Sequence, residues 1–218
     1  MVVVIDGPSG SGKSSTARRV AERSGFYFLD SGAFYRCFTL AYQREESDSD
    51  RFRQKLNNYH VDAGYGNGEF LIRLDGEDVT REIRDSRVTS GVSRIAEIPE
   101  VRARVNELLR VLASRNNIIA DGRDLGTAVF PDADLKFFMV ADLETRARRR
   151  MKELDEMGFQ GDLDEIRNNL KDRDTIDSGR KTDPLRRADD AILIDTTALT
   201  FGEQVELILA RIREHQNK

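Results

Sequence analysis

The sequence is poor in the residues that build cross-links and metal centres. Among its 218 residues there is one cysteine, Cys37, and there are two histidines. A single cysteine excludes an intrachain disulfide and is typical of a reducing compartment, so we expect a cytoplasmic protein in which Cys37 is a small buried residue. His60 and His215 lack the spacing of a metal-ligand pair, so we expect neither to bind a metal.

Long apolar runs are also missing. The leading run Val2–Ile5 stops at Asp6, which is too short for a signal peptide or a membrane span. Hydrophobic residues make up 39% of the chain and charged residues 34%, a balance typical of folded, soluble proteins. The length suits a single domain with excursions or two small domains, and we expect no membrane partner.

An excess of basic charge is absent as well. The net charge is −4 and the isoelectric point is about 5.4, which argues against a broad nucleic-acid surface. Yet 28 of the 35 basic residues are arginines. Because arginine binds phosphate with a two-pronged fork, this composition indicates local phosphate sites rather than a basic coat.

The first residues carry the clearest motif. Val2–Ile5 predicts a buried strand, and Thr16–Gly25 predicts a helix closed by glycine. Between them Gly7, Gly12, Lys13 and Ser14 match the phosphate-binding loop G-x-x-x-x-G-K-[ST]. Backbone N–H groups of such a loop converge on phosphate oxygens, and the helix dipole favours the anion. We expect ATP to contact Gly7, Pro8, Ser9, Gly10, Ser11, Gly12, Lys13, Ser14 and Ser15, with Lys13 on the β/γ-phosphates and Ser14 on Mg²⁺.

The rest of the chain alternates strands with helices, which predicts an α/β fold with a parallel sheet. The five expected strands are 2–5, 26–29, 118–120, 135–140 and 191–194, and the expected helices include 33–44, 99–115, 143–157 and one opened by the Thr200–Glu203 capping box. Residues 61–80 alternate and turn at Asp75-Gly76, which predicts an antiparallel hairpin in a small inserted subdomain. Residues 162–172 predict a further helix, and 173–187 predict a charged, mobile segment.

Ligands of a parallel sheet bind beyond the carboxyl ends of its strands. Four segments carry polar groups there, namely the phosphate loop, Asp30–Gly32, Asp121–Asp124 and Asp195–Thr197, and a charged cluster at 173–180 follows on the mobile segment. Asp121 suits both a structural loop cap and a water-mediated Mg²⁺ contact. The run Arg146, Arg148, Arg149 and Arg150 is interpreted as a solvated helix face, with the alternative that Arg150 touches the donor base.

These residues, taken in order, resemble the bacterial cytidylate kinase family over nearly the whole chain. The matching segments are Gly7–Ser15, Leu29–Arg36, Asp75–Thr80, Ile83-Arg84, Ser93, Pro99, Val101-Arg102, Asp121–Thr127, Phe130–Ala133, Arg173-Asp174, Asp177, Arg180, Pro184-Leu185 and Ala188–Ala191. The resemblance implies a nucleoside monophosphate kinase: a three-layer P-loop fold with a five-stranded parallel sheet. It implies a core of residues 1–60 and 93–218, a lid at about 158–187, and a monophosphate-binding insert at 61–92. It further implies a monomer that uses Mg²⁺ and ATP to phosphorylate CMP or dCMP.

The resemblance also assigns roles to individual residues. Lys13, Arg123, Arg173 and Arg180 would be catalytic. CMP would contact Ser31, Gly32, Tyr35, Arg36, Ser93, Arg102, Arg123, Asp124, Arg173, Asp177 and Arg180. The metal would be held by Ser14 and Asp121. Since the acceptor phosphate is already largely ionised at neutral pH, the transfer needs charge neutralisation by arginines rather than a general base.

Asp124 has two interpretations: it accepts a hydrogen bond from the cytosine amine, or it only orients Arg123. The resemblance places Ser93 and Arg102 beside it at the base.

Other functions on the same core remain as alternatives. A kinase for UMP, AMP or a metabolite hydroxyl is disfavoured by the charged 173–180 cluster and the hairpin. A GTPase switch would need an Asn-Lys-x-Asp or Thr-Lys-x-Asp motif, which the sequence lacks. A nucleic-acid-stimulated ATPase is disfavoured by the acidic balance. Turnover of CMP but not of other acceptors separates these alternatives.

Overall fold

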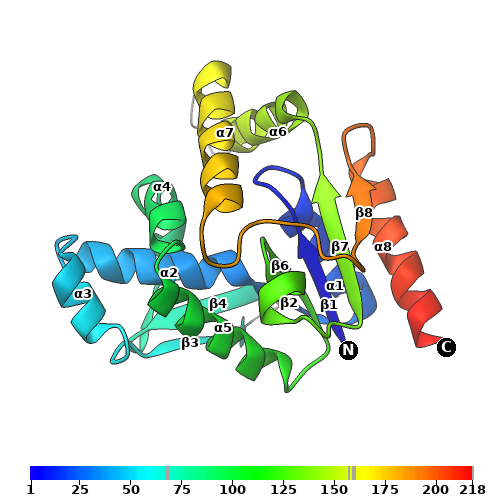
Figure 1. Ribbon diagram of the computed structural model, residues 1–218. Coiled ribbons are helices and arrows are strands. Elements are labelled where there is room, and N and C mark those ends of the chain that lie inside the picture. The colour runs from blue at the N-terminus through cyan, green and yellow to red at the C-terminus, as the bar shows by residue number, and fades with distance from the viewer. Residues whose placement is uncertain (67–68, 157, 159–160, 218) are drawn as a thin grey trace. The chain divides into compact units, whose positions relative to one another are not determined.

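The computed structural model describes residues 1–66, 69–156, 158 and 161–217, and the chain divides into two compact units. The first unit contains Met1–Phe28 and Arg115–Lys218, and the second contains Leu29–Ser114. Figure 1 labels the elements of both. In the part of the chain that the structure describes, no helix combines the length and the apolar character needed to cross a bilayer.

A five-stranded parallel sheet runs through the first unit, as the sequence predicts. Its order is β2-β6-β1-β7-β8, and β2 ends with the first two residues of the second unit. The strands are β1 (Val2–Asp6), β2 (Tyr27–Asp30), β6 (Ile118–Gly122), β7 (Leu135–Val140) and β8 (Ile192–Asp195). In the central register Asp6 lies opposite Gly122. The segments that follow β1 and β6, the phosphate loop and the Arg123-Asp124 loop, therefore leave the same edge of the sheet.

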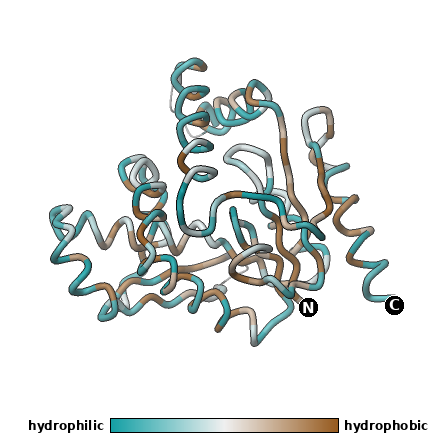
Figure 2. The backbone as a smooth tube through the Cα atoms, in the orientation of Figure 1, coloured by the Kyte–Doolittle hydropathy of each residue, from teal (hydrophilic) through white to brown (hydrophobic). Residues whose placement is uncertain are grey.

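Two helices of the first unit cover one face of this sheet. They are α1 (Lys13–Ser24) and α8 (Phe201–Gln216), and α8 opens with the predicted capping box between Thr200 and Glu203. Their apolar side chains form one buried cluster with the strands, with Val20 from α1, Ile208 from α8, and Ile5 and Phe137 from the sheet. In Figure 2 the strands of this sheet are mainly hydrophobic, whereas hydrophobic and hydrophilic residues alternate along α8. The core thus fixes the start of α1, where the phosphate loop ends.

The other helix pair of the unit differs from the sequence prediction. α6 (Leu143–Glu156) packs on α7 (Leu163–Gly179) through a small cluster of Ala147, Ile166 and Leu170. The expected end of this helix at residue 172 is wrong, because α7 continues through Gly179, and the mobility of 173–187 stays a prediction. The buried side of this last part of α7 carries Asp177, which pairs with Arg123. A charged residue at a buried position breaks the apolar pattern from which a helix is predicted. A short π-helical turn, Leu125–Val129, also stands where a loop is expected.

The second unit combines helices with a small antiparallel sheet. Its elements are α2 (Ser31–Arg44), α3 (Ser49–Lys55), β3 (Val61–Gly66), β4 (Glu69–Leu74), β5 (Glu77–Asp78), a 3₁₀ turn (Glu82–Arg84), α4 (Ser86–Ile95) and α5 (Pro99–Ala113). The predicted hairpin is present, because β3 pairs antiparallel with β4 and Asp75-Gly76 turns the chain with positive φ. The compact unit extends beyond the hairpin, and the separate role of 61–92 as a substrate-binding insert stays a prediction.

Cys37 lies in α2 and is fully buried, in agreement with the expectation of a small core residue. Burial raises the pKa of its thiol to about 12. The thiolate, which is the reactive form, is therefore strongly disfavoured while the second unit is folded.

Candidate active site

The phosphate loop joins β1 to α1 through three glycines with positive φ, Gly7 (152°), Gly10 (77°) and Gly12 (90°). A Cβ at Gly7 would lie 2.1 Å from the Met139 carbonyl oxygen of β7, which no side chain can tolerate. At Gly10 a Cβ would approach the Arg146 side chain to 3.1 Å. The glycines are thus required by close packing as well as by backbone conformation.

Two arginines of α6 hold this loop from outside. Arg146 donates from Nη1 to the Ser9 carbonyl oxygen at 3.0 Å, and Arg149 donates to the Ser11 carbonyl oxygen at 3.4 Å. Arg149 also binds Thr196 through its hydroxyl (2.9 Å) and carbonyl (2.6 Å) oxygens. The prediction of a solvated arginine face is therefore wrong for Arg146, which is buried, and for Arg149, which is half-buried. Because the Ser9 and Ser11 carbonyl oxygens accept hydrogen bonds from these guanidinium groups, the N–H groups of the loop are left to point toward an anion.

Lys13 is buried, with 4% of its surface exposed, and its Nζ donates to the Pro8 carbonyl oxygen at 3.1 Å. Burial, and then the positive charge of Arg123, lower the pKa of Lys13 to about 7. Arg173 acts in the same direction, whereas Asp121 and Asp177 oppose it. The first unit thus gathers these four charged groups around Lys13, and two of them, Arg123 and Arg173, are arginines predicted to be catalytic.

Ser14 and Asp121 meet at the start of α1. The Ser14 hydroxyl donates to Oδ2 of the buried Asp121 carboxylate. A hydroxyl and a carboxylate side by side fit Mg²⁺, which takes one or two protein oxygens and fills its other positions with phosphate and water. The sequence left Asp121 open between a loop cap and a metal contact, and this pairing favours the second interpretation.

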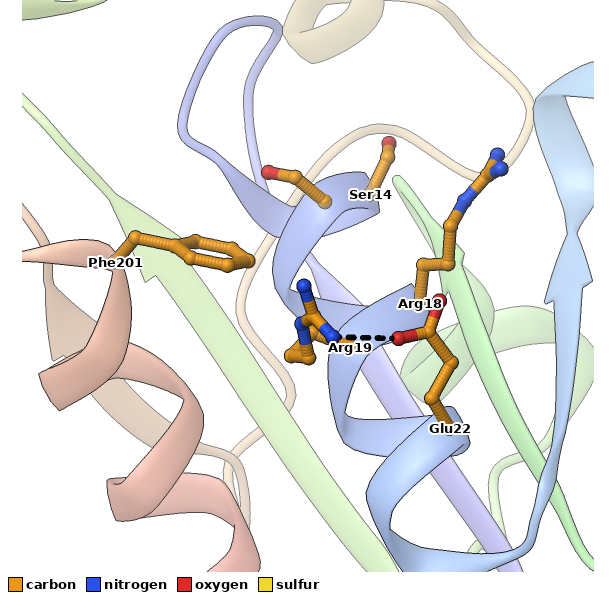
Figure 3. A pocket seen from close by; sticks show the side chains of 6 residues that line it. Ser14, Arg18, Arg19, Glu22 and Phe201 are labelled. Atoms are coloured by element: carbon orange, nitrogen blue, oxygen red, sulfur yellow. Dashed lines mark ion pairs between the residues drawn. The ribbon is translucent and has the colours of Figure 1, made fainter.

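An open pocket of about 370 Å³ begins at Ser14 and continues along α1. Figure 3 shows Ser14 and Arg18 on one helix, the ion pair between Arg19 and Glu22, and the Phe201 ring of α8. Ser14 is an exposed residue and lines this pocket.

Asp6, to which the sequence analysis gave no role, holds the segment that follows Arg123 and Asp124. Its carboxylate is buried and accepts backbone N–H groups of Leu125 at 2.9 Å and Gly126 at 2.8 Å. Burial raises the pKa of Asp6 to about 7. Its place at the end of an apolar strand, directly before a glycine-rich loop, is the signal by which it could have been found.

Two ion pairs connect α7 with the loop after β6. Arg123 donates from Nε to Oδ2 of Asp177 at 2.9 Å, and Arg180 donates from Nη2 to Oδ1 of Asp124 at 2.8 Å. Asp124 thus binds Arg180, and both interpretations of its role, base recognition and orientation of Arg123, stay predictions. Both pairs bring predicted acceptor-binding residues of the first unit together.

The second unit carries its own group of predicted residues around Asp30. Asp30 caps α2 by accepting the Ala33 N–H at 2.9 Å, and it binds Nη2 of Arg36 (2.9 Å) and Nη2 of Arg84 (2.8 Å). Burial by itself would raise the pKa of Asp30, but the charges of Arg36 and Arg84 outweigh it and hold that pKa below its ordinary value. Ser31 and Gly32 open the same helix, and a Cβ at Gly32 would crowd Nη1 of Arg36 at 3.1 Å.

Arg102 of α5 is buried, with 1% of its surface exposed. Its guanidinium carbon lies 5.6 Å from the centre of the Tyr35 ring, and Nη1 donates to the Ala96 carbonyl oxygen at 3.2 Å. Ser93 of α4 is buried in the same unit. A buried guanidinium over an aromatic ring is a cation–π arrangement, which fixes Arg102 in one orientation.

The predicted residues thus fall into two groups, one in each unit. The first unit holds the phosphate loop with Lys13, Ser14, Asp121, Arg123, Asp124, Arg173, Asp177 and Arg180, and the second holds Ser31, Gly32, Tyr35, Arg36, Ser93 and Arg102. Arg150 pairs with Glu153 at 2.9 Å on α6, and its contact with a donor base stays a prediction. The residues missed from the sequence are Asp6, Arg84, Arg146 and Arg149.

Comparison with known proteins gives one consistent result. A family model described as cytidylate kinase matches residues 3–214. The chain is 44% identical over 216 residues to the cytidylate kinase of Caldanaerobacter subterraneus subsp. tengcongensis, covering 98% of this chain and 95% of that protein. It is 40% identical over 220 residues to the cytidylate kinase of Streptococcus gordonii, with 99% and 98% covered. An uncharacterized protein from Eubacterium ventriosum, 13% identical over 98% of both chains, has a similar solved structure with a TM-score of 0.53, which bears on the fold alone.

Proposed function

The chain belongs to the cytidylate kinase family, and from that premise we propose that it transfers the γ-phosphoryl group of ATP to CMP or dCMP, giving ADP and CDP or dCDP. The observation that carries the proposal is the setting of Lys13, a buried ammonium at the phosphate loop with Arg123 and Arg173 close enough to lower its pKa. Three positive groups around one point suit the joining of two anions. No general base is needed, because the acceptor phosphate is already ionised.

We propose that the donor phosphates bind to the loop Gly7–Ser15. Its N–H groups and Lys13 would neutralise the β- and γ-phosphates. Arg146 and Arg149 would act indirectly by holding the Ser9 and Ser11 carbonyls away from the ligand. Mg²⁺ would be held by the Ser14 hydroxyl, with Asp121 adjacent, and would supply Lewis-acid stabilisation of the transferring phosphoryl group. Arg150 is the proposed contact to the donor base.

Residues of both groups would bind the acceptor. Arg36, Arg123, Arg173 and Arg180 supply guanidinium forks for its phosphate, and Arg173 with Asp177 suits the ribose. Asp177 and Asp124 pair with two of these guanidiniums, those of Arg123 and Arg180. Paired in this way, the arginines are held in fixed orientations, which lowers the cost of ordering them when phosphate binds.

The cytosine base presents an amine donor beside ring acceptors. Asp124 can accept a hydrogen bond from the amine, while Arg102 and Ser93 can donate to the ring oxygen and nitrogen. Further contacts to CMP are proposed for Ser31, Gly32 and Tyr35. A uracil base would turn a carbonyl oxygen toward the carboxylate and leave a buried charge without its partner. We therefore expect CMP and dCMP to be preferred over UMP.

The test is a coupled ADP-release assay with MgATP and a panel of CMP, dCMP, UMP, AMP and GMP. The proposal requires turnover of CMP and dCMP at least about 100-fold more efficient than of the others, in line with recognition of hydrogen-bonding groups. A preference for AMP or UMP would assign the chain to a different acceptor. We further propose a monomer acting in the cytoplasm without nucleic acid, which light scattering of the purified protein and unchanged turnover on adding RNA would support.

A further inference from the structure

One carboxylate of the second unit binds two arginines, and only one of them has a proposed role. Asp30 accepts from Nη2 of Arg36 through both oxygens, at 3.1 and 2.9 Å, and from Nη2 of Arg84 at 2.8 Å. Arg36 belongs to α2, whereas Arg84 ends the 3₁₀ turn Glu82–Arg84. A shared carboxylate oxygen brings the two guanidinium groups side by side, although they are far apart in the sequence.

The cluster has the charge and the donors that a phosphate requires. Two guanidiniums and one carboxylate leave one net positive charge. Within the described residues, the Arg84 guanidinium has Asp30 as its hydrogen-bonding partner through Nη2, so Nε and Nη1 remain to donate to a ligand. Its side chain is 46% exposed while Asp30 is 8% exposed, so the fork is fixed at one end and accessible at the other. A fixed, accessible fork is the geometry in which arginine binds phosphate oxygens.

Arg84 is not needed as a tether for its own segment. The turn is already anchored by Ile83, whose side chain is wholly buried, and by the ion pair between Glu82 and Arg44 of α2 at 2.7 Å. The buried Asp30 carboxylate also keeps its ion pair with Arg36 at 2.9 Å, so it does not need Arg84 to balance its charge. Anchoring the turn to α2 therefore does not account for the position of Arg84.

We propose that Arg84 binds the acceptor phosphate together with Arg36, and that Asp30 is a positioning residue that holds both forks in place. The inference rests on the proposed function, because it adds one residue to the acceptor site of that reaction. It also explains why a buried aspartate caps α2: the same carboxylate caps the start of the helix and orients the two phosphate ligands.

The experiment compares binding of CMP with binding of cytidine, which lacks the phosphate, by titration calorimetry of wild-type protein, Arg84→Ala and Arg84→Lys. Arg84→Ala should weaken CMP binding by about 10- to 100-fold, the range for a hydrogen bond to a charged group, and leave cytidine binding unchanged. Arg84→Lys keeps the charge but loses the fork, so it should fall between wild type and Arg84→Ala. Glu82→Gln is the matched control, since it removes the other tether of the same turn without touching the cluster.

A loss of CMP affinity in Arg84→Ala that cytidine shares equally would overturn the inference, because it would make Arg84 structural. An equal loss in Glu82→Gln would do the same. Unchanged CMP binding in Arg84→Ala, with normal CMP turnover by the wild-type protein, overturns the inference and leaves the proposed function intact. A folded wild-type protein that does not phosphorylate CMP overturns both.

Discussion

Arg180 and Asp124 face each other at 2.8 Å with only 4% and 6% of their side chains exposed. Arg180 follows the last turn of α7, and Asp124 follows β6 in the same loop as Arg123. The pair therefore fastens α7 to the loop that carries two predicted acceptor ligands. Because both groups are buried, removing either one would leave a costly buried charge behind.

The Asp124 carboxylate is expected to read the base. Asp124→Asn keeps the shape but removes the charge that accepts from the cytosine amine, so kcat/KM should fall much more for CMP than for UMP. A site of this kind discriminates by roughly 10²–10⁴, and the variant should lose most of that ratio. Asp177→Asn is the matched control, because it also frees an arginine but should affect both acceptors alike. An equal loss for the two acceptors in Asp124→Asn would leave only the ion pair with Arg180 as its role.

Lys13 is expected to act on the transferring phosphate. Lys13→Ala should fold normally and lose about 10²–10³ in kcat, the usual cost of one preorganised electrostatic group. The measurement is kcat at saturating MgATP and CMP, with circular dichroism to check the fold. Near-normal turnover in a folded variant would remove Lys13 from the mechanism.

The lowered pKa of Lys13 predicts a proton linkage in ATP binding. With a pKa of about 7 the free lysine is charged below that pH and increasingly neutral above it. Bound phosphates favour the charged form, so at about pH 8 ATP binding should take up a fraction of one proton, and at about pH 6 almost none. Calorimetry in buffers of different ionisation enthalpy measures the uptake. Lys13→Arg, which stays charged throughout, should abolish it; persistent uptake in that variant would assign the linkage to another group.

Gly7 should tolerate no side chain. Its Cβ would lie 2.1 Å from the Met139 carbonyl oxygen, and that atom belongs to the backbone of a central strand. Gly25 also has positive φ, but a Cβ there meets nothing within 4 Å. In urea unfolding Gly25→Ala should lose about 1–2 kcal/mol for the left-handed conformation alone. Gly7→Ala should lose more than about 3 kcal/mol, since overpacking adds to that strain; equal losses would contradict the close approach.

Ligand binding should protect the segment that follows α7. Residues 163–179 are helical, so the largest slowing of hydrogen exchange is expected in 180–187 when CMP and a non-hydrolysable ATP analogue are both present. Exchange in the middle of α8 serves as the internal control. A lid role for this segment would fail if exchange in 180–187 stayed the same with both ligands bound.

The phosphate loop and the sheet could be predicted because their signals are local. A four-residue apolar run before a glycine pattern identifies both the strand and the loop, and the Gly25 closure ends the helix. The predicted strands deviate from those observed by up to two residues at their ends, as expected when hydrogen bonding rather than sequence defines the boundary.

The failures have a different physical origin. Arg146 and Arg149 look like surface charge, and only the fold places the Ser9 and Ser11 carbonyls against them. In the same way Asp177 lengthens α7 through a partner more than fifty positions away in the chain, Arg123. Charged residues buried by long-range pairing carry no periodicity, so sequence patterns assign them to solvent.

The chain's one sulfhydryl belongs to Cys37 of α2 and is fully buried, so its reactivity reports how often the second unit opens. A thiol-reactive dye can label it only during excursions that expose the α2 interior, so the labelling rate divided by the rate for a free thiol gives the population of opened molecules. No engineered probe is required and no other side chain competes for the reagent. Adding CMP should slow the labelling to the extent that the nucleotide binds the closed form of this unit, so the labelling rate of Cys37 also reports acceptor affinity.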